Sequence, residues 1–253
     1  MMFFFGIKNF EFSSQLQIPL FQNVGNLSSN ISLYKCYAEE NKWKILELTN
    51  NRLNDDFYII ENDEIDNETI FFLAEKEDFI DYDYLSLKNF NNFTDTIPAY
   101  RANLQINLLN GGFSSYQSDY PFDMTLKKGS ILSSVCSIAN ADAQKNYIFI
   151  KNIYTKPIHE SFNAYLVNIE KKIVEEKFEV KTNYTNFFEL DKALIRPEIF
   201  LVTESYLGIP MYVSTNNGHI SFEHTHPPHE FILSENKFKK VSDIKKKINE
   251  IIN

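Results

Sequence analysis

Hydrophobic positions along the chain fall in short runs or alternate with polar positions, and turn residues interrupt them roughly every ten positions. Period-two alternation is typical of β-strands, and such regular turn spacing is typical of sandwiches and barrels. We therefore predict a mainly β fold, an antiparallel β-sandwich or jelly-roll-like architecture. The expected strands are Ile31–Ala38, Trp43–Leu48, Phe57–Ile60, Ile70–Leu73, Leu104–Leu109, Tyr147–Ile150, Phe187–Leu190, Ile199–Thr203 and Met211–Ser214.

The segment Asn163–Val180 fits two interpretations. A helical apolar stripe would be formed by Leu166, Ile169, Ile173 and Phe178. Alternating apolar positions on both sides of the polar Glu170–Lys172 would instead form a β-hairpin. We predict the hairpin because the neighbouring segments are strand-like.

The end of the chain carries the clearest helix signal, an amphipathic pattern. One face would hold Val241, Ile244, Ile248, Ile251 and Ile252, and the other face most of Lys245–Lys247. Ser242 can accept hydrogen bonds from the first-turn N–H groups, and Asp243 suits the positive end of the helix dipole. We expect a C-terminal helix that begins there and docks on a sheet.

The 253 residues suffice for one large β domain or two small ones. Asp95–Pro98 separates an acidic region from a more apolar half, so we predict an N-terminal β lobe at 1–95. The C-terminal lobe, 96–253, would carry a His-rich hairpin and the terminal helix. Asp55–Asp83 contains twelve acidic residues, which is typical of a solvated face. A calcium loop at Glu61–Asp66 would need a central glycine, which is missing.

Composition excludes some classes of protein. Hydrophobic residues make up 43% and aromatic residues 15%, which is too much apolar material for a disordered chain. The formal net charge of −9 has the wrong sign for a nucleic-acid binder, which needs a basic face. Frequent Asn, Lys, Ile, Phe and Tyr indicate the A+T-rich codon usage of a bacterial-type genome rather than a function.

We expect a cytoplasmic protein without a membrane partner. The N-terminal MMFFFGIK lacks the preceding basic residues and the cleavage site of a signal peptide. No uncharged apolar segment approaches the roughly 18 residues of a membrane helix. Cys36 and Cys136 alone do not form a disulfide framework.

Asn217-Gly218 is the strongest local signal in the sequence. Both central residues of a type I′ turn have positive φ, which Asn and Gly tolerate best. A two-residue loop would pair Asn216 with His219, Ser214 with Ser221, Tyr212 with Glu223, and Met211 with His224. One face of this hairpin would hold Met211, Val213, Ile220, Phe222, His224 and His226, and the other Tyr212, Ser214, His219, Ser221 and Glu223.

Four of the five histidines lie between positions 219 and 229. His224 and His226 would point the same way from the end of a strand that Pro227-Pro228 terminates. Two such imidazoles converge well on one metal ion. We expect a divalent metal ion (zinc, iron or manganese) bound by His224 and His226, with Glu230, His229 or His159 completing the site.

The spacing of Gly218, His224-Thr225-His226 and Glu230 resembles the first metal-binding motif of the cupins. In that family the two histidines and the glutamate are metal ligands inside a small β-barrel. The resemblance implies the same role for His224, His226 and Glu230. It is confined to the first motif, because residues 231–253 contain none of the His, Gly and Pro of the second.

Other residues suggest a ligand site. Arg101, in an apolar segment, could hold a ligand carboxylate or phosphate, or form an internal ion pair. Tyr116, Asp119 and Tyr120 lie in a segment that combines hydroxyl groups, a carboxylate and aromatic rings. Such a segment could bind a polar ligand, but it could also form an ordinary turn. Glu223 is a further candidate for ligand binding. His159-Glu160-Ser161 cannot form a triad locally, because neighbouring residues on a strand face opposite ways, and the G-x-S-x-G motif is absent.

Three functions fit these observations. The first is a metal-dependent enzyme or binding protein for a small polar ligand, which uses the histidine cluster. The second is a non-catalytic β-sandwich module that binds a glycan or a protein and in which the histidines are structural. A structural homo-oligomer, with exposed apolar area at its subunit interface, is a third.

Overall fold

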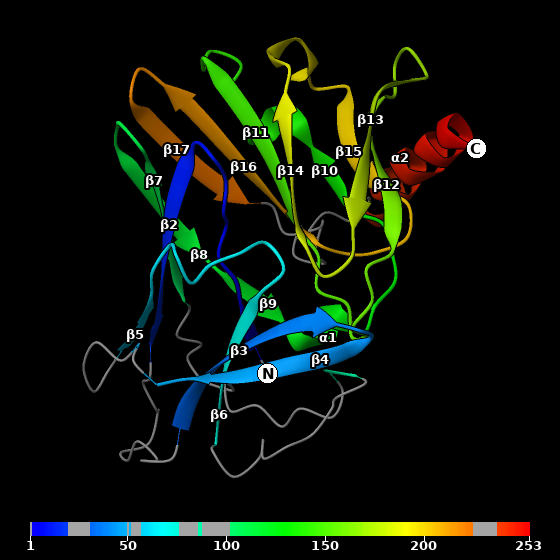
Figure 1. Ribbon diagram of the computed structural model, residues 1–253. Helices are drawn as coiled ribbons and strands as arrows, with labels where there is room; N and C mark the ends of the chain where they lie inside the picture. The colour runs from blue at the N-terminus through cyan, green and yellow to red at the C-terminus, as the bar shows by residue number, and fades with distance from the viewer. Residues whose placement is uncertain are drawn as a thin grey trace.

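The computed structural model describes residues 2–19, 31–49, 51, 57–75, 86–87, 102–224 and 237–253. These residues form four antiparallel sheets (Figure 1), which confirms the predicted mainly β, sandwich-like fold. Sheet I has the strand order β4-β3-β6-β1-β9, and sheet II the order β5-β2-β7-β8. Sheet III has the order β14-β11-β16-β17, and sheet IV the order β10-β15-β12-β13.

The strands of sheets I and II are β1 (Met2–Phe4), β2 (Phe12–Pro19), β3 (Ile31–Glu39), β4 (Lys42–Leu48), β5 (Phe57–Ile60), β6 (Ile70–Glu75), β7 (Asn103–Leu108), β8 (Phe113–Gln117) and β9 (Asp119–Pro121). Those of sheets III and IV are β10 (Leu132–Ser134), β11 (Lys145–Lys151), β12 (Ser161–Asn168), β13 (Ile173–Lys181), β14 (Thr185–Leu190), β15 (Ile199–Thr203), β16 (Ile209–Asn216) and β17 (His219–His224). The helical segments are α1 (Phe122–Thr125), η3 (Val135–Ser137), η4 (Lys192–Leu194) and α2 (Lys237–Ile252).

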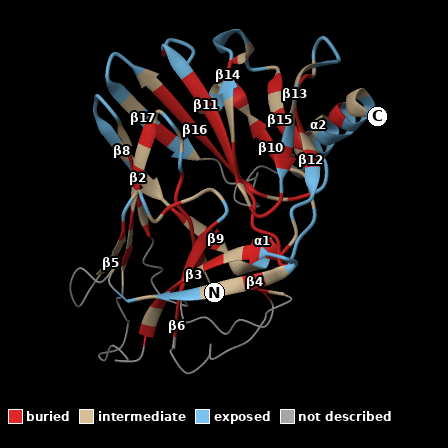
Figure 2. Ribbon diagram, in the orientation of Figure 1, coloured by how far each residue is buried: buried red, intermediate tan, exposed pale blue. Residues whose placement is uncertain are grey.

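Sheet III is the central layer, because both of its faces are buried. Tyr147 and Phe149 of β11 belong to the largest core cluster, together with residues of sheets I and II. Ile148 and Ile150 alternate with them and join a second cluster, with residues of sheet IV. Burial on both faces explains why this strand is a continuous apolar run in the sequence. Figure 2 shows β11 and β16 buried along most of their length, whereas the hairpin tips are exposed.

Helix α2 covers the outer face of sheet IV. Its apolar stripe packs on Tyr165, Val167 and Val202, while Lys245–Lys247 are exposed, so the docking prediction is confirmed. The predicted start was wrong, because the helix begins at Lys237 rather than near Ser242. The residues before Ser242 already have helical backbone, so its hydroxyl lies beyond the first turn and cannot cap it.

The segment at 161–181 is the predicted hairpin, β12 and β13, with a turn that contains Lys172 at φ 58°. Strand β2 was not among the predicted strands, although its alternate residues Phe12, Leu16 and Ile18 are buried. Asp95–Pro98 lies outside the described residues. The largest core cluster draws on residues from both sides of position 95, and the two-lobe division stays a prediction.

Cys36 and Cys136 are both free thiols, and burial raises the pKa of Cys36. Within the described ranges, no helix combines the length and the apolar character that crossing a bilayer would require.

Candidate functional site

The β16–β17 hairpin has the predicted register and turn. The observed pairs include Asn216 with His219 and Met211 with His224. Asn217 and Gly218 have φ values of 47° and 79°, as a type I′ turn requires. The hairpin therefore places His224 at the end of β17, on the face that carries Met211 and Phe222.

His224 contacts the segment that the sequence analysis selected for ligand binding. Its ring lies edge-to-face with Tyr116 of β8, with the centroids 4.3 Å apart. Its Nε2 lies 3.3 Å from Nε2 of Gln117. An amide nitrogen only donates, so this contact fits His224 as an acceptor at Nε2. The structure thus joins one predicted metal ligand to one predicted ligand-binding residue, at the border of sheets II and III.

The described residues do not place the other predicted metal ligands beside His224. His226, His229 and Glu230 lie outside the described residues. His159 is exposed in the segment between β11 and β12, with Nδ1 3.3 Å from the carbonyl oxygen of Thr182. Among the residues that the structure places, no three His, Cys, Asp or Glu side chains gather closely enough to hold a metal ion.

The predicted polar-ligand residues are dispersed. Arg101 lies outside the described residues. Asp119 accepts a hydrogen bond from the backbone N–H of Ala102 at 3.1 Å. Tyr120 is fully buried, and burial raises the pKa of its hydroxyl. Glu223 is exposed on the opposite side of β17 from His224.

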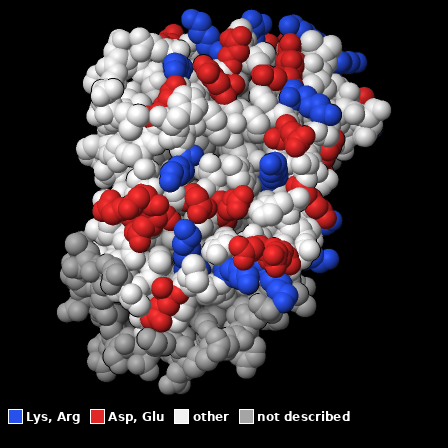
Figure 3. All heavy atoms as spheres, viewed as in Figure 1, with Lys and Arg blue, Asp and Glu red and all other residues white. Residues whose placement is uncertain are grey.

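A concave surface lies where the β7–β8 turn meets the β16–β17 turn, and we call it the tip groove. It has a volume of about 550 Å³. Its lining residues come from the segment before β2, the β7–β8 turn, the start of β11 and the β16–β17 turn: Phe10, Glu11, Leu108, Leu109, Asn110, Gln144, Lys145, Thr215, Asn216, Asn217 and Gly218. In Figure 3 the upper left of the molecule, where these hairpin tips lie in Figure 1, shows mostly uncharged atoms.

Glycines at the two turns allow the walls of the tip groove to make backbone contact. The backbone N–H of Gly112 donates to the carbonyl oxygen of Gly218 at 2.7 Å, which joins the β7–β8 turn to the β16–β17 turn. A Cβ at Gly111 would lie 2.6 Å from the same carbonyl oxygen. The close approach of the two turns therefore requires glycine at position 111.

Gly111→Ala should push the two turns apart, because the obstructing atom belongs to the backbone and cannot rotate away. We expect a loss of about 1–3 kcal/mol in the free energy of unfolding, as for other overpacked sites. Chemical denaturation measures it. Gly129→Ala is the control, since a Cβ there meets the Leu207 side chain no closer than 3.4 Å. Equal stability of the two variants would contradict the prediction.

The apolar wall of the tip groove is unusually exposed. Phe10 is 76% exposed and contacts Phe187 edge-to-face, with the ring centroids 6.3 Å apart. Leu109 is 65% exposed on the neighbouring turn. Burying a phenylalanine side chain is worth about 1.5–3 kcal/mol, so the fold forgoes that stabilisation at Phe10. Phe10 and Leu109 line the same groove, and exposed apolar patches at grooves mark recognition sites.

The polar wall of the tip groove consists of side-chain amides and one ion pair. Gln144 donates from Nε2 to Asn217 Oδ1 at 2.9 Å, and its Oε1 accepts from the backbone N–H of Asn217 at 2.9 Å. Lys145 Nζ lies 2.6 Å from Glu11 Oε1. The hydroxyl of Tyr147 donates to the second carboxylate oxygen of Glu11.

A smaller, more polar pocket of about 300 Å³ lies at one end of β12, β13 and β15. Its carboxylates have partners in the protein. Glu160 accepts from the Tyr206 hydroxyl, and Glu204 accepts from the Tyr165 hydroxyl and from Asn163 Nδ2 at 2.9 Å. Tyr206 is buried, so this pocket lacks the exposed aromatic ring of the tip groove.

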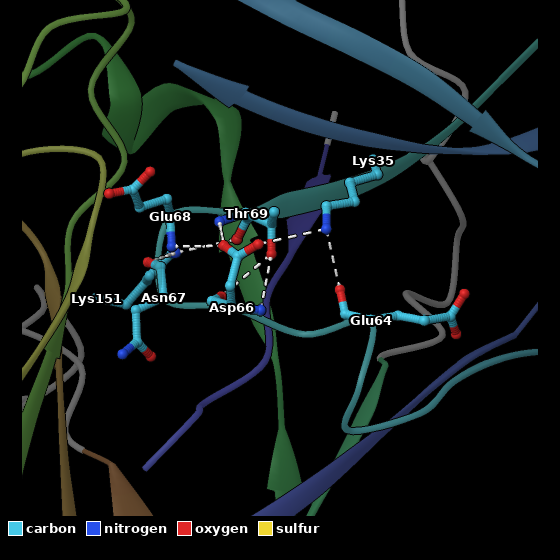
Figure 4. Close-up of polar contacts among 7 residues, drawn as sticks. All are labelled: Lys35, Glu64, Asp66, Asn67, Glu68, Thr69 and Lys151. Atoms are coloured by element: carbon cyan, nitrogen blue, oxygen red, sulfur yellow. Dashed lines mark hydrogen bonds and ion pairs between the residues drawn. The ribbon is translucent and has the colours of Figure 1, made fainter. Parts of the chain in front are cut away.

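The acidic region contributes a structural loop, residues 61–69 between β5 and β6 (Figure 4). Oδ1 of Asp66 accepts from the backbone N–H groups of Glu68 and Thr69 at 2.9 and 2.8 Å. Its Oδ2 lies 3.3 Å from Lys35 Nζ. The Asp66 carboxylate therefore binds donors of the protein itself, which is the role of a structural turn.

Lys151, at the end of β11, anchors the same loop from the interior. Its side chain is fully buried, and Nζ donates to the carbonyl oxygens of Asn67 at 3.2 Å and Thr69 at 3.1 Å. Burial lowers the pKa of Lys151 to about 7, although the charges of Asp66 and Glu68 act in the opposite direction. Figure 4 shows this lysine reaching the loop from the side opposite Lys35. It lines neither pocket, so we assign it a structural role.

Phe10, Glu11 and Lys145 of the tip groove were not among the predicted site residues. The signals that could have located the tip groove are Gly111-Gly112 and Asn217-Gly218, two turn signals whose loops meet in the fold. Phe10 itself follows no apolar period. Comparisons of the chain with protein families, with curated proteins and with solved structures each found no match.

Proposed function

We propose that the protein is a non-catalytic β-sandwich module that binds a carbohydrate in the tip groove. The observation that carries this proposal is the exposed ring of Phe10 beside a wall of side-chain amides. A pyranose ring presents C–H groups on its faces and hydroxyl groups around its edge. It can therefore stack on an aromatic ring while its hydroxyls exchange hydrogen bonds with amides.

The size and the lining of the groove support binding of a small ligand. Its volume of about 550 Å³ lies within the range of about 300–1,000 Å³ that is usual for ligand sites. A stable protein partner would cover about 800 Å² of this chain, which is a much larger area than a groove of this size provides. A sugar fits these dimensions better than a protein surface does.

The chemistry of the groove supports binding rather than cleavage. Glycoside hydrolysis usually needs two carboxyl groups on opposite sides of the bond. The described lining contains one, Glu11, and that carboxylate is already engaged by Lys145 and Tyr147.

The test is a glycan array probed with the purified protein, followed by calorimetric titration of the best-bound oligosaccharide. Phe10→Ala should weaken binding at least tenfold, which corresponds to about 1.4 kcal/mol. Phe113→Ala is the matched control, because Phe113 is 65% exposed on the adjacent hairpin but does not line the groove. An array without binding, or equal losses in the two variants, would refute the proposal.

The metal-dependent function remains a prediction, because three of its five candidate ligands lie outside the described residues. His224 alone is held at the end of β17, with Gln117 and Tyr116 beside it. The described residues alone do not form a site for the metal that the cupin resemblance implies.

A further inference from the structure

Among its described lining residues, the tip groove has one positive and one negative side chain, and they neutralise each other. Lys145 Nζ and Glu11 Oε1 are 2.6 Å apart, and the Tyr147 hydroxyl occupies the other oxygen of Glu11. The remaining polar side chains of the described lining are uncharged: Asn110, Gln144, Thr215, Asn216 and Asn217. The groove therefore offers a ligand polar groups but no net charge.

We infer that the tip groove selects uncharged sugars, and that Lys145 is the residue that sets this selection. The inference rests on the proposed carbohydrate-binding function. An amine-bearing sugar would need the Glu11 carboxylate, which Lys145 occupies. An acidic sugar would need the Lys145 ammonium, which Glu11 occupies. Either ligand would have to compete with the ion pair for the charge that it needs.

The ion pair stays charged over a wide range of pH. Burial alone would raise the pKa of Glu11, but the hydrogen bonds from Lys145 and Tyr147 outweigh it and place that pKa below 4.5. The hydrogen bond with Glu11, followed by the Tyr147 hydroxyl, raises the pKa of Lys145 above 10.5. The selection is therefore constant between these two limits.

Side-chain amides suit neutral hydroxyl groups. Each amide carries a donor and an acceptor, and a sugar hydroxyl is also both a donor and an acceptor. Asn110 and Asn216 are exposed and line the groove on the two turns that meet there. They can bind hydroxyl groups without any change of charge.

The experiment compares the wild-type protein and three variants on one array that carries neutral, amine-bearing and uronic-acid oligosaccharides of matched linkage. The wild-type protein should favour the neutral members at least tenfold. Lys145→Met should release Glu11 and shift the preference at least tenfold towards the amine-bearing members. Glu11→Gln should release Lys145 and shift the preference towards the uronic acids by a similar factor. Lys127→Met, at an exposed lysine outside the groove lining, should bind as the wild type does.

The outcomes separate the inference from the proposed function. Lys145 is 46% exposed at its side chain, so its replacement should leave the fold intact, and Glu11→Gln gives an independent reading of the same ion pair. Charged sugars bound as tightly as neutral ones, or unchanged preferences in both variants, would overturn the inference while the carbohydrate function stands. A wild-type protein that binds none of the sugars would overturn both.

Discussion

Replacing Lys151 with methionine should remove a large pH dependence from the stability of the protein. In the folded state burial lowers the pKa of Lys151 from its ordinary value of 10.5 to about 7. Between these two values the unfolded chain holds a proton that the folded protein has lost. Stability therefore rises with pH across this window and is constant below it with respect to this group.

The expected size follows from the same two values. Each pKa unit corresponds to about 1.4 kcal/mol, so Lys151 contributes a rise of about 5 kcal/mol between pH 7 and pH 10.5. Methionine has a similar length and does not titrate, so the rise disappears in the variant. It also removes the donor to the carbonyl oxygens of Asn67 and Thr69, which is a separate loss of stability.

Denaturant titrations from about pH 6 to about pH 10 would measure the difference between the two proteins. Lys127→Met serves as the control, because Lys127 is exposed and its loss should leave the pH profile unchanged. If the wild type and Lys151→Met gave parallel curves, the buried amine would not titrate as described.

Truncating Phe149 should produce a large loss of stability. Its side chain is 1% exposed in the central sheet. The ring lies 4.9 Å from that of Phe187 in its own sheet and 6.2 Å from that of Phe12 in sheet II. Phe149→Ala removes both contacts and leaves a cavity, for which about 3–5 kcal/mol is the usual cost.

Thermal unfolding of Phe149→Ala would also test the predicted division into two lobes. Because Phe149 joins sheet III to strand β2 of sheet II, we expect one cooperative transition that shifts as a whole. Phe113→Ala, on an exposed ring, should change stability by less than about 0.5 kcal/mol. A transition that splits into two, with one part at the wild-type temperature, would instead support lobes that unfold independently.

The sequence predicted those parts of the fold that local chemistry determines. The β16–β17 register follows from Asn217-Gly218, because one turn type fixes every pair along the hairpin. The strand from Phe57 to Ile60 matched at both ends. The start of α2 did not, because Ser242 has the chemistry of a cap whether it precedes the helix or lies within it.

The candidate site was less predictable, because tertiary contacts assemble it. Glu11 and Lys145 are 134 positions apart, and their ion pair depends on β2 packing against β11. The exposure of Phe10 depends on which residues pack beside it in the folded protein. Its place in the sequence belongs to no periodic pattern of apolar residues from which exposure could be predicted. His224 was located on the correct face of its strand, but its contact with Tyr116 needed the arrangement of two sheets.

The strand order of sheet III has a consequence for biosynthesis. Strand β11 pairs with β14 and β16, and both follow it in the chain. Until residue 185 is added, the nascent chain contains the apolar segment Tyr147–Ile150 but neither of its hydrogen-bonding neighbours, and β16 is complete only at residue 216. A nascent strand with apolar side chains on both faces is prone to pair with other chains. We expect the nascent chain to require holding chaperones until β16 has left the exit tunnel.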